Sequence, residues 1–108
     1  MKVNNTERFY GMLGFAMRAG RVIIGTDLVC AAMAKKGAKK PSLVLFSSEA
    51  SDATKKKITA KCEFYAIESL EIDAMPEELG RRLGKSFAPV VLGVADDAFA
   101  EEIRRAIK

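Results

Sequence analysis

The chain has 108 residues, of which 49% are hydrophobic, and this size suits one compact domain with a core of its own. Eighteen Lys and Arg against fourteen Asp and Glu give a net charge of +4, and the sequence contains no His. Because His is the usual proton shuttle near neutral pH and the commonest metal ligand, this composition argues against an enzyme and against a metal centre. We therefore expect residues 1–108 to form a single non-catalytic domain without a cofactor.

The first third of the chain predicts a helix, a strand and a second helix. Apolar residues recur every three or four positions in the first segment, a β-branched run between glycines follows, and an Ala-rich segment comes next. The predicted elements are a helix over 5–19 ended by Gly20, a strand over 21–24, a turn at Gly25, and a helix over 27–36 with Thr26 as its cap and Gly37 as its stop.

The rest of the chain continues this alternation. The predicted elements are a strand over 43–46, a helix over 52–62 capped by Ser51, a strand over 64–67, a helix from Pro76 ended by Gly84, a loop over 85–89, a strand over 90–94, and a last helix that begins at Asp96 and Asp97. Helices that alternate with short strands indicate an α/β fold, a three-layer α/β/α sandwich with a largely buried sheet.

The turn at Gly25 predicts a binding site for an anion. A strand that ends in a glycine turn before a helix leaves backbone N–H groups free at the positive end of the helix dipole. The surrounding charge is positive, since residues 18–61 hold ten basic and three acidic side chains, whereas residues 62–108 hold six and ten. Contacts to phosphates need both charge and donors. We therefore expect a nucleic-acid backbone to bind Gly25 together with Arg18, Arg21, Lys35 and Lys36.

Several other features allow two interpretations. Phe87 lies in a predicted loop and either stacks on an unpaired base or fills the core. The lysines at 55–57 form either a solvated helix face or a phosphate contact. Cys30 and Cys62 stand alone in apolar surroundings, which is typical of buried, reduced thiols. We find neither a signal peptide nor an apolar run long enough to span a membrane, and expect a cytoplasmic protein.

Several strings of the sequence, in their order along the chain, are characteristic of one family. They are residues 13–21, 25–26, 54–58, 61–65, 78–80 and 83–85, together with the closing strand over 90–94. In this ordered set the chain resembles the YlxQ-like bacterial branch of the ribosomal protein L-seven-Ae / L-thirty-e superfamily, whose members include kink-turn RNA binders. The resemblance implies an α/β/α sandwich around a four-stranded mixed sheet, and non-catalytic binding of structured RNA of ribosomal type, with ribosome-associated proteins as further partners and no small-molecule substrate.

The resemblance also implies where RNA binds. Kink-turn binders hold RNA with the glycine turn, the first turns of the second helix and the loop before the last strand. The corresponding residues here are Gly25, Thr26 and Asp27, and Ser86, Phe87 and Ala88. We also expect Lys85, beside this loop, to contact RNA.

Three positions depart from the pattern of kink-turn readers. Those proteins carry Asn, Glu and Lys where this chain has Asp27, Leu28 and Ala31. An ionised Asp has no proton to donate to guanine O6 or N7, so Asp27 either accepts from a base amino group or assists the start of the helix. We therefore expect RNA binding that is more electrostatic, and less specific for kink-turns, than that of the kink-turn readers in the family. The alternative function is a protein-interaction adaptor that retains the fold and has lost RNA recognition.

Overall fold

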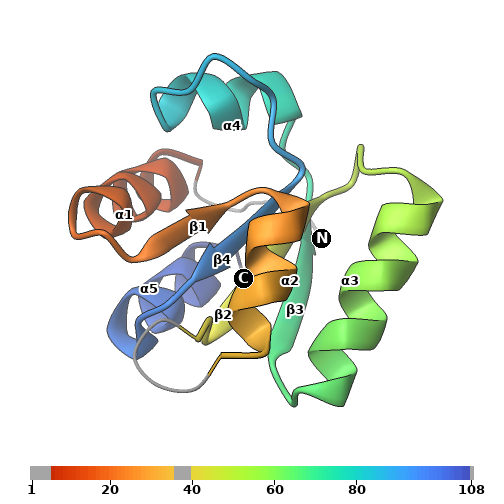
Figure 1. Cartoon of the computed structure of the whole chain (residues 1–108). Helices are drawn as coiled ribbons and strands as arrows, with labels where there is room; N and C mark the ends of the chain where they lie inside the picture. Colours follow the sequence, from red (N-terminus) through yellow and green to blue (C-terminus); the bar gives the residue numbers. More distant parts are fainter. Residues whose placement is uncertain (1–5, 36–39, 108) are drawn as a thin grey trace.

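The computed structural model describes residues 6–35 and 40–107, in which helices and strands alternate along the chain (Figure 1). The elements are α1 (Thr6–Arg18), β1 (Val22–Ile24), α2 (Thr26–Met33), β2 (Leu43–Ser47), α3 (Asp52–Phe64), β3 (Glu68–Ile72), α4 (Pro76–Arg82), β4 (Val91–Val94) and α5 (Asp97–Ile107).

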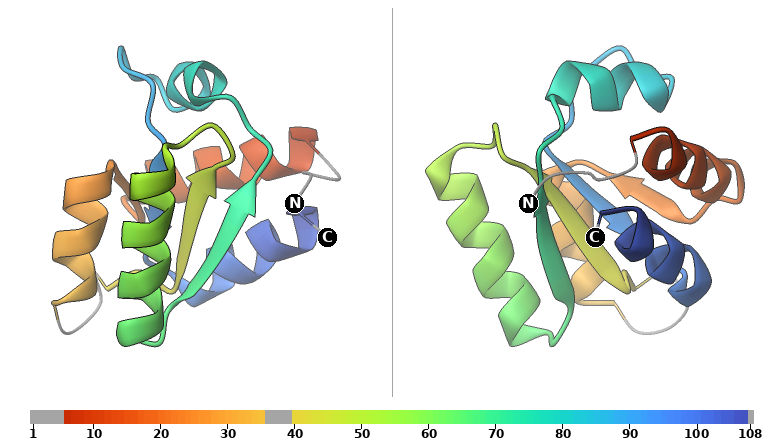
Figure 2. Two further views of the ribbon diagram at one scale, coloured as in Figure 1. Left: turned by 90° about the vertical axis from the view of Figure 1, so that its right-hand side faces the viewer. Right: turned by 180° about the vertical axis from the view of Figure 1, so that it is seen from behind.

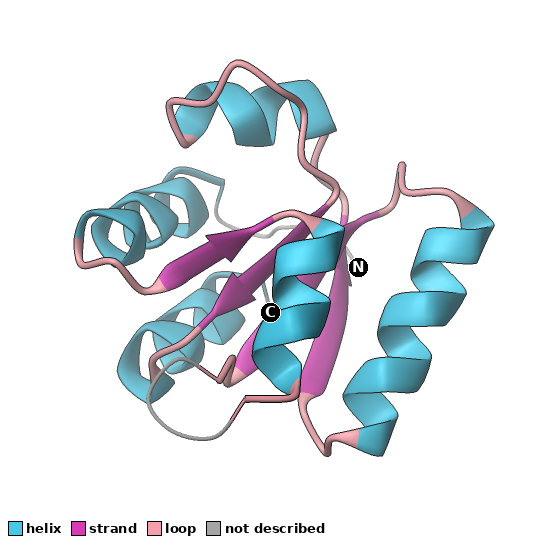
Figure 3. Ribbon diagram, viewed as in Figure 1, coloured by secondary structure: helices cyan, strands magenta, loops and turns pink. Residues whose placement is uncertain are grey.

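The four strands form one mixed sheet in the order β1-β4-β2-β3. β2 and β3 run parallel, whereas β4 is antiparallel to both of its neighbours. Helices α2 and α3 cover one face of the sheet, and α1 and α5 cover the other (Figures 1 and 2). Helix α4 lies beyond one end of the sheet (Figure 3). The α/β/α sandwich around a four-stranded mixed sheet is thus confirmed.

The sheet divides the apolar core into two clusters. Because successive side chains of a strand point to opposite faces, Leu43 and Leu45 of β2 join the cluster under α1 and α5, while Val44 and Phe46 join the cluster under α2 and α3. All five residues of β2 and all four of β4 are buried. Apolar runs without alternation are therefore the signature of these two central strands.

Three helices end in the same hydrogen-bonding motif, which needs one residue with a left-handed backbone. Gly20 takes this position after α1 with φ 73°, and Gly84 takes it after α4 with φ 71°, as their sequence positions predict. Helix α3 uses Ala66 instead, with φ 56°. The N–H of Ala66 donates to the carbonyl of Glu63, and the N–H of Ile67 donates to the carbonyl of Cys62.

The strand predicted over 64–67 is wrong, because these residues form the end of α3 and the turn after it. Phe64 is the last residue of α3, and β3 begins at Glu68. Because position 66 is not a glycine, the sequence gives no signal that the helix ends here. The aromatic and β-branched residues at 64–67 therefore have the composition of a strand. The true strand contains Glu68 and Glu71, which β3 tolerates because it is an edge strand paired with β2 alone.

The second helix also differs from its prediction. It ends at Met33, and the N–H of Lys35 donates to the carbonyl of Ala32 in a tightened last turn. Ala and Lys are strong helix formers, so nothing in the sequence marks this stop; Gly37, the predicted one, lies outside the described residues. Thr26 is the first helical residue and Gly25 takes the cap position, so the predicted cap is wrong.

Two other helix starts agree with the sequence. The Ser51 hydroxyl accepts the N–H of Thr54 at 3.2 Å and thereby caps α3 as predicted. At α5 a carboxylate oxygen of Asp96 accepts the N–H of Phe99 at 2.9 Å.

Candidate nucleic-acid interface

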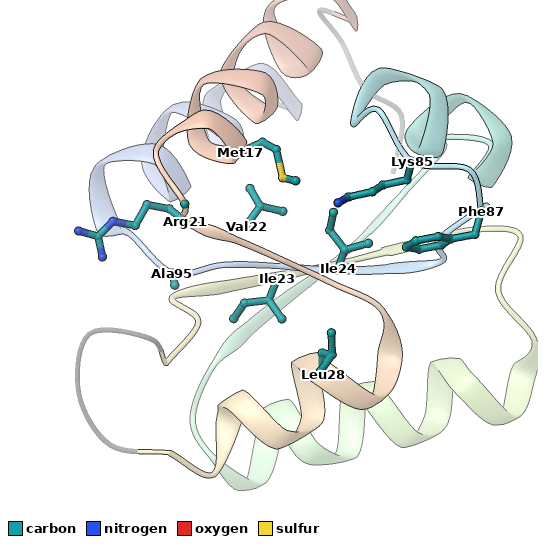
Figure 4. A pocket seen from close by; sticks show the side chains of 10 residues that line it. Met17, Arg21, Val22, Ile23, Ile24, Leu28, Lys85, Phe87 and Ala95 are labelled. Carbon is teal, nitrogen blue, oxygen red and sulfur yellow. The ribbon is translucent and has the colours of Figure 1, made fainter.

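An open pocket of about 430 Å³ lies beside β1, and we call it the β1 pocket (Figure 4). Three segments that are far apart in the sequence form most of it: the end of α1 with β1, the first turn of α2, and the loop between α4 and β4. Ala95, directly after β4, completes it. The residues that line it are Met17, Gly20, Arg21, Val22, Ile23, Ile24, Leu28, Lys85, Phe87 and Ala95.

Strand β1 is accessible because it is an edge of the sheet. It pairs with β4 on one side only. Gly25, directly after it, has φ 108° and ψ 148°, a region essentially confined to glycine. The N–H of Gly25 donates to the carbonyl of Val91 at 2.9 Å, which ties the start of α2 to β4. The glycine turn therefore fixes the N-terminus of α2 at the pocket.

The first turn of α2 presents backbone donors. Gly25 has no side chain with which to cap the helix, so the first N–H groups of α2 lack a side-chain acceptor. Together with the helix dipole, they favour an anion at this place. Leu28 lines the pocket and is 64% exposed. Asp27 does not line it: its side chain is 97% exposed, and one carboxylate oxygen lies 3.8 Å from Lys57 Nζ on α3.

The loop between α4 and β4 supplies Lys85 and Phe87 to the pocket. Phe87 is 53% exposed, so its alternative as a core residue is wrong. The loop is held against α4 by backbone contacts: the N–H of Lys85 donates to the carbonyl of Gly80 at 2.8 Å. A Cβ atom at Gly80 would lie only 2.2 Å from the carbonyl oxygen of Phe87. Ser86 is exposed in the same loop but does not line the pocket.

The cations of the β1 pocket stand at its two ends. Figure 4 shows Lys85 extending over Ile24, while the Arg21 guanidinium points outward at the opposite end. Arg18 is exposed at the last turn of α1, and its guanidinium carbon lies 4.8 Å from the centroid of the Phe15 ring. Arg18 does not line the pocket itself.

The structure does not bring Lys35 to this site. It lies beyond the C-terminal end of α2, so the whole helix, about 12 Å long, separates it from Gly25. Lys36 lies outside the described residues. Of the lysines on α3, Lys55 lies 3.2 Å from Glu71 and Lys57 contacts Asp27, while Lys56 is exposed.

Sequence reasoning missed the apolar lining of the pocket. Met17, one of the recurring apolar residues of the first helix, is half-buried and lines the pocket. Val22, Ile23 and Ile24 are likewise half-buried, because β1 is an edge strand. Edge position follows from strand order, which no local pattern reveals.

The thiols and acids do not form a second site. Cys62 is buried, and this burial raises the pKa of its thiol to about 11, so it stays protonated at neutral pH. Cys30 is free and half-buried. Within residues 6–35 and 40–107, no group of three His, Cys, Asp or Glu is placed to hold a metal ion. No helix in these ranges is long and apolar enough to cross a membrane.

The architecture and the pocket place the chain in the class of small α/β/α sandwich proteins with a four-stranded mixed sheet and a glycine turn before the second helix. The model of the "Ribosomal protein L7Ae/L30e/S12e/Gadd45 family" matches residues 7–104, and the chain belongs to this family.

Two relatives are similar over nearly their whole lengths. The RNA-binding protein YlxQ of Bacillus subtilis (strain 168) is 38% identical over 95 residues, which cover 88% of this chain and 90% of that protein. The RNA-binding protein YlxQ of Enterococcus faecium is 31% identical over 108 residues, covering 100% and 99%.

Solved structures show the same fold. A protein with unknown function from Bacillus halodurans C superimposes with a TM-score of 0.81 at 33% identity, over 93% of this chain and 96% of the other. The Giardia lamblia 15.5kD RNA binding protein has a TM-score of 0.72 at 15% identity, over 94% and 83%, and this similarity concerns the fold alone.

Proposed function

We propose that this chain is a non-catalytic RNA-binding protein that holds structured RNA of ribosomal type in the β1 pocket, in the cytoplasm. The observation that carries this proposal is the convergence of three distant segments on one open pocket. They supply the cations of Arg21 and Lys85, the exposed aromatic ring of Phe87, and Leu28 of the first turn of α2, where the helix has no side-chain cap. Two relatives named RNA-binding proteins support it.

Each part of the pocket has its own role in the proposed complex. A phosphate binds at the uncapped first turn of α2, where the donors and the helix dipole act together. Phe87 stacks on an unpaired base, and Arg21 and Lys85 neutralise neighbouring phosphates. Arg18, Thr26 and Ser86 are not lining residues but lie close in sequence to residues that are, and they extend the proposed contact.

The proposed binding is weakly specific for kink-turns. Leu28 presents an apolar side chain at the pocket, where amide or ammonium donors would be needed to read guanine. Asp27, as a carboxylate, accepts hydrogen bonds only, and it faces Lys57 rather than the pocket. Affinity therefore depends on the phosphate backbone and on an unpaired base more than on the kink-turn motif.

A filter-binding titration in increasing salt tests the proposal with two RNAs, a kink-turn and a plain duplex. With Arg18, Arg21 and Lys85 as phosphate contacts, the logarithm of affinity should fall against the logarithm of salt with a slope of about −2 to −3. The kink-turn should bind only modestly better than the duplex, because its bulge offers an unpaired base.

A matched control is Lys56→Ala, which removes an exposed cation from α3 away from the pocket. It should leave the slope nearly unchanged, whereas Arg21→Ala should reduce it by about one. If neither RNA binds at any salt concentration, the proposed function is wrong. A strong preference for the kink-turn would contradict the proposed role of Asp27 and Leu28.

One observation favours a second function, that of a protein-interaction adaptor. Most side chains of the β1 pocket are apolar, and Leu28 and Phe87 are more than half exposed at it. A protein segment could cover them. Pull-down from lysate with and without ribonuclease separates the two functions: partners that persist after RNA is removed favour the adaptor, and partners that all disappear favour RNA binding.

A further inference from the structure

A second surface carries aromatic and cationic side chains together, at the C-terminal ends of α2 and α3. We call it the Phe64 patch, and it consists of Lys35, Lys40, Lys61, Phe64 and Tyr65. Phe64 is 80% exposed, the largest exposure among the large apolar side chains described. Its ring meets the Tyr65 ring edge-on, with centroids 4.9 Å apart and planes at 89°. Lys40 Nζ lies 5.9 Å from the centroid of Tyr65.

The topology brings these residues to one end of the molecule. Helices α2 and α3 run side by side in the same direction, so their C-termini point to the same end of the sheet (Figures 1 and 2). Lys35 follows α2, and Lys61 lies in the last turn of α3, one turn before Phe64 and Tyr65. The β1 pocket lies at the opposite end of α2, beside its first turn.

Helix stability alone does not explain this composition. Cations near a helix C-terminus are favourable, which accounts for Lys35 and Lys61. The helix dipole does not account for the apolar side chain of Phe64. This side chain belongs to neither core cluster, whereas the neighbouring Tyr65 packs against the cluster under α2 and α3. A flat partner that covered this ring would remove apolar surface from water, which is favourable.

Aromatic rings between lysines form the arrangement that binds unpaired nucleic acid. Every base has a flat π-face that can stack on a ring, and neighbouring ammonium groups neutralise the backbone phosphates. We infer that the Phe64 patch is a second RNA contact, specific for single-stranded segments, in which a base stacks on Phe64 while Lys35, Lys40 and Lys61 hold adjacent phosphates. Glu63 is the exposed acid in the same turn, and it weakens this contact.

The inference extends the proposed function but does not depend on the β1 pocket. The probe is therefore an unstructured RNA, an oligouridine of about ten nucleotides. Fluorescence anisotropy at low salt should show that Phe64→Ala weakens binding of this oligonucleotide about tenfold. Phe64→Trp should retain or increase affinity, because it keeps a flat ring, whereas Phe64→Leu should behave as Phe64→Ala. Glu63→Gln should increase affinity slightly.

Two control variants locate the contact. Lys56→Ala removes an exposed lysine of the same helix and should change affinity less than about twofold. Phe87→Ala removes the ring of the β1 pocket and should weaken oligouridine binding less than Phe64→Ala does, because the Phe64 patch is proposed as the main contact for unpaired segments. Because Phe64 is 80% exposed, thermal unfolding should show that its variants fold as the wild type does.

A joined probe tests whether both surfaces act on one RNA. A structured RNA with a single-stranded extension of about ten nucleotides should bind about tenfold tighter than the same RNA with about two, because only the longer one passes along α3, which is about 20 Å long. Phe64→Ala should abolish this gain and leave the binding of the short-extension RNA unchanged.

Three outcomes would overturn the inference. Phe64→Ala could leave oligouridine binding unchanged, or Phe87→Ala could abolish it. In the third outcome, oligouridine does not bind, and a protein is captured from lysate only by chains with Phe64 intact. Failure of structured RNA to bind any variant would instead overturn the proposed function, and the oligouridine result would still decide the role of the Phe64 patch.

Discussion

The β1 pocket and the Phe64 patch differ in how they are built. The pocket is a hollow with a mainly apolar lining, made by three distant segments that backbone contacts hold together. The patch is an open surface at the ends of two helices, where the exposed ring of Phe64 meets Tyr65 and Lys40 lies near the Tyr65 ring. The pocket should therefore hold the phosphates of a structured RNA together with one unpaired base, whereas the patch should accept an unpaired base of any single-stranded segment.

The same difference predicts how each surface responds to mutation. The position of Phe87 depends on the close approach of its carbonyl group to Gly80 on α4. Phe64 depends only on the end of α3. A change in backbone packing should damage the pocket and spare the patch, while changes in charge should affect whichever surface carries the residue.

The largest effect is expected for Gly80→Val. A Cβ atom there would lie 2.2 Å from the carbonyl oxygen of Phe87, and backbone cannot yield as a side chain can. We expect the loop to shift, the free energy of unfolding to fall by about 1–3 kcal/mol, and structured RNA to bind more than tenfold more weakly. Urea unfolding and filter binding measure the two effects.

Gly11→Ala is the matched control for that variant. Gly11 is exposed within α1, and an added Cβ would meet nothing within 4 Å. This substitution should increase the free energy of unfolding by about 1 kcal/mol and leave RNA binding unchanged. Oligouridine binding by Gly80→Val should also persist at a temperature where the variant is folded. Wild-type stability and affinity in Gly80→Val would refute the close backbone contact.

The next largest effect is expected when the pocket loses its charges. The double variant Arg21→Ala, Lys85→Ala should bind structured RNA about tenfold more weakly and flatten the salt dependence by about two. Lys35→Ala, at the other end of α2, should leave both quantities unchanged and weaken oligouridine binding instead. If both variants lost the same affinity for structured RNA, the proposed distinction between the two surfaces would be wrong.

A smaller effect of opposite sign is expected for Asp27→Asn. The carboxylate is exposed beside the first turn of α2 and repels a phosphate bound there. Its neutral amide should bind structured RNA about threefold tighter, with the larger gain for the kink-turn because an amide can donate to guanine. Oligouridine binding should not change. A loss of affinity, measured by filter binding, would mean that the carboxylate itself accepts a hydrogen bond from RNA.

The smallest effect is expected for Ala66→Gly, beside the Phe64 patch. Glycine removes the cost of a left-handed backbone at φ 56° but gains entropy in the unfolded chain. The net result should be a stabilisation of about 0.5 kcal/mol, seen in urea unfolding, with unchanged affinity for oligouridine. A clear destabilisation would show that Ala66 is not held in this conformation.

The turns and helix ends at these two surfaces also show how far backbone conformation can be predicted from a single sequence. The glycines at 20, 25 and 84 marked helix ends and the turn at the pocket, because backbone conformations with positive φ strongly favour glycine. The same conformation at Ala66 was invisible, and the end of α3 was predicted as a strand. Local patterns thus predict conformation well where the residue type that favours it is present, and poorly where packing imposes the conformation on another residue.

The candidate site was predictable in part for the same reason. Arg21, Gly25 and Phe87 stand out in the sequence by charge, turn geometry and loop position. The inclusion of Met17 and the exclusion of Lys35 depend on which strand is the sheet edge and which end of α2 faces the loop. These are properties of topology, and no window of the sequence contains them.

The most direct test of RNA binding in the β1 pocket is amide chemical-shift mapping of the isotope-labelled chain during titration with a kink-turn RNA. We expect the largest changes at residues 21–28 and 85–88, with β3 and the Phe64 patch nearly unaffected. Oligouridine should then shift Lys61, Phe64 and Tyr65 instead. Shifts from the kink-turn that avoid residues 21–28 and 85–88 would contradict the proposed site.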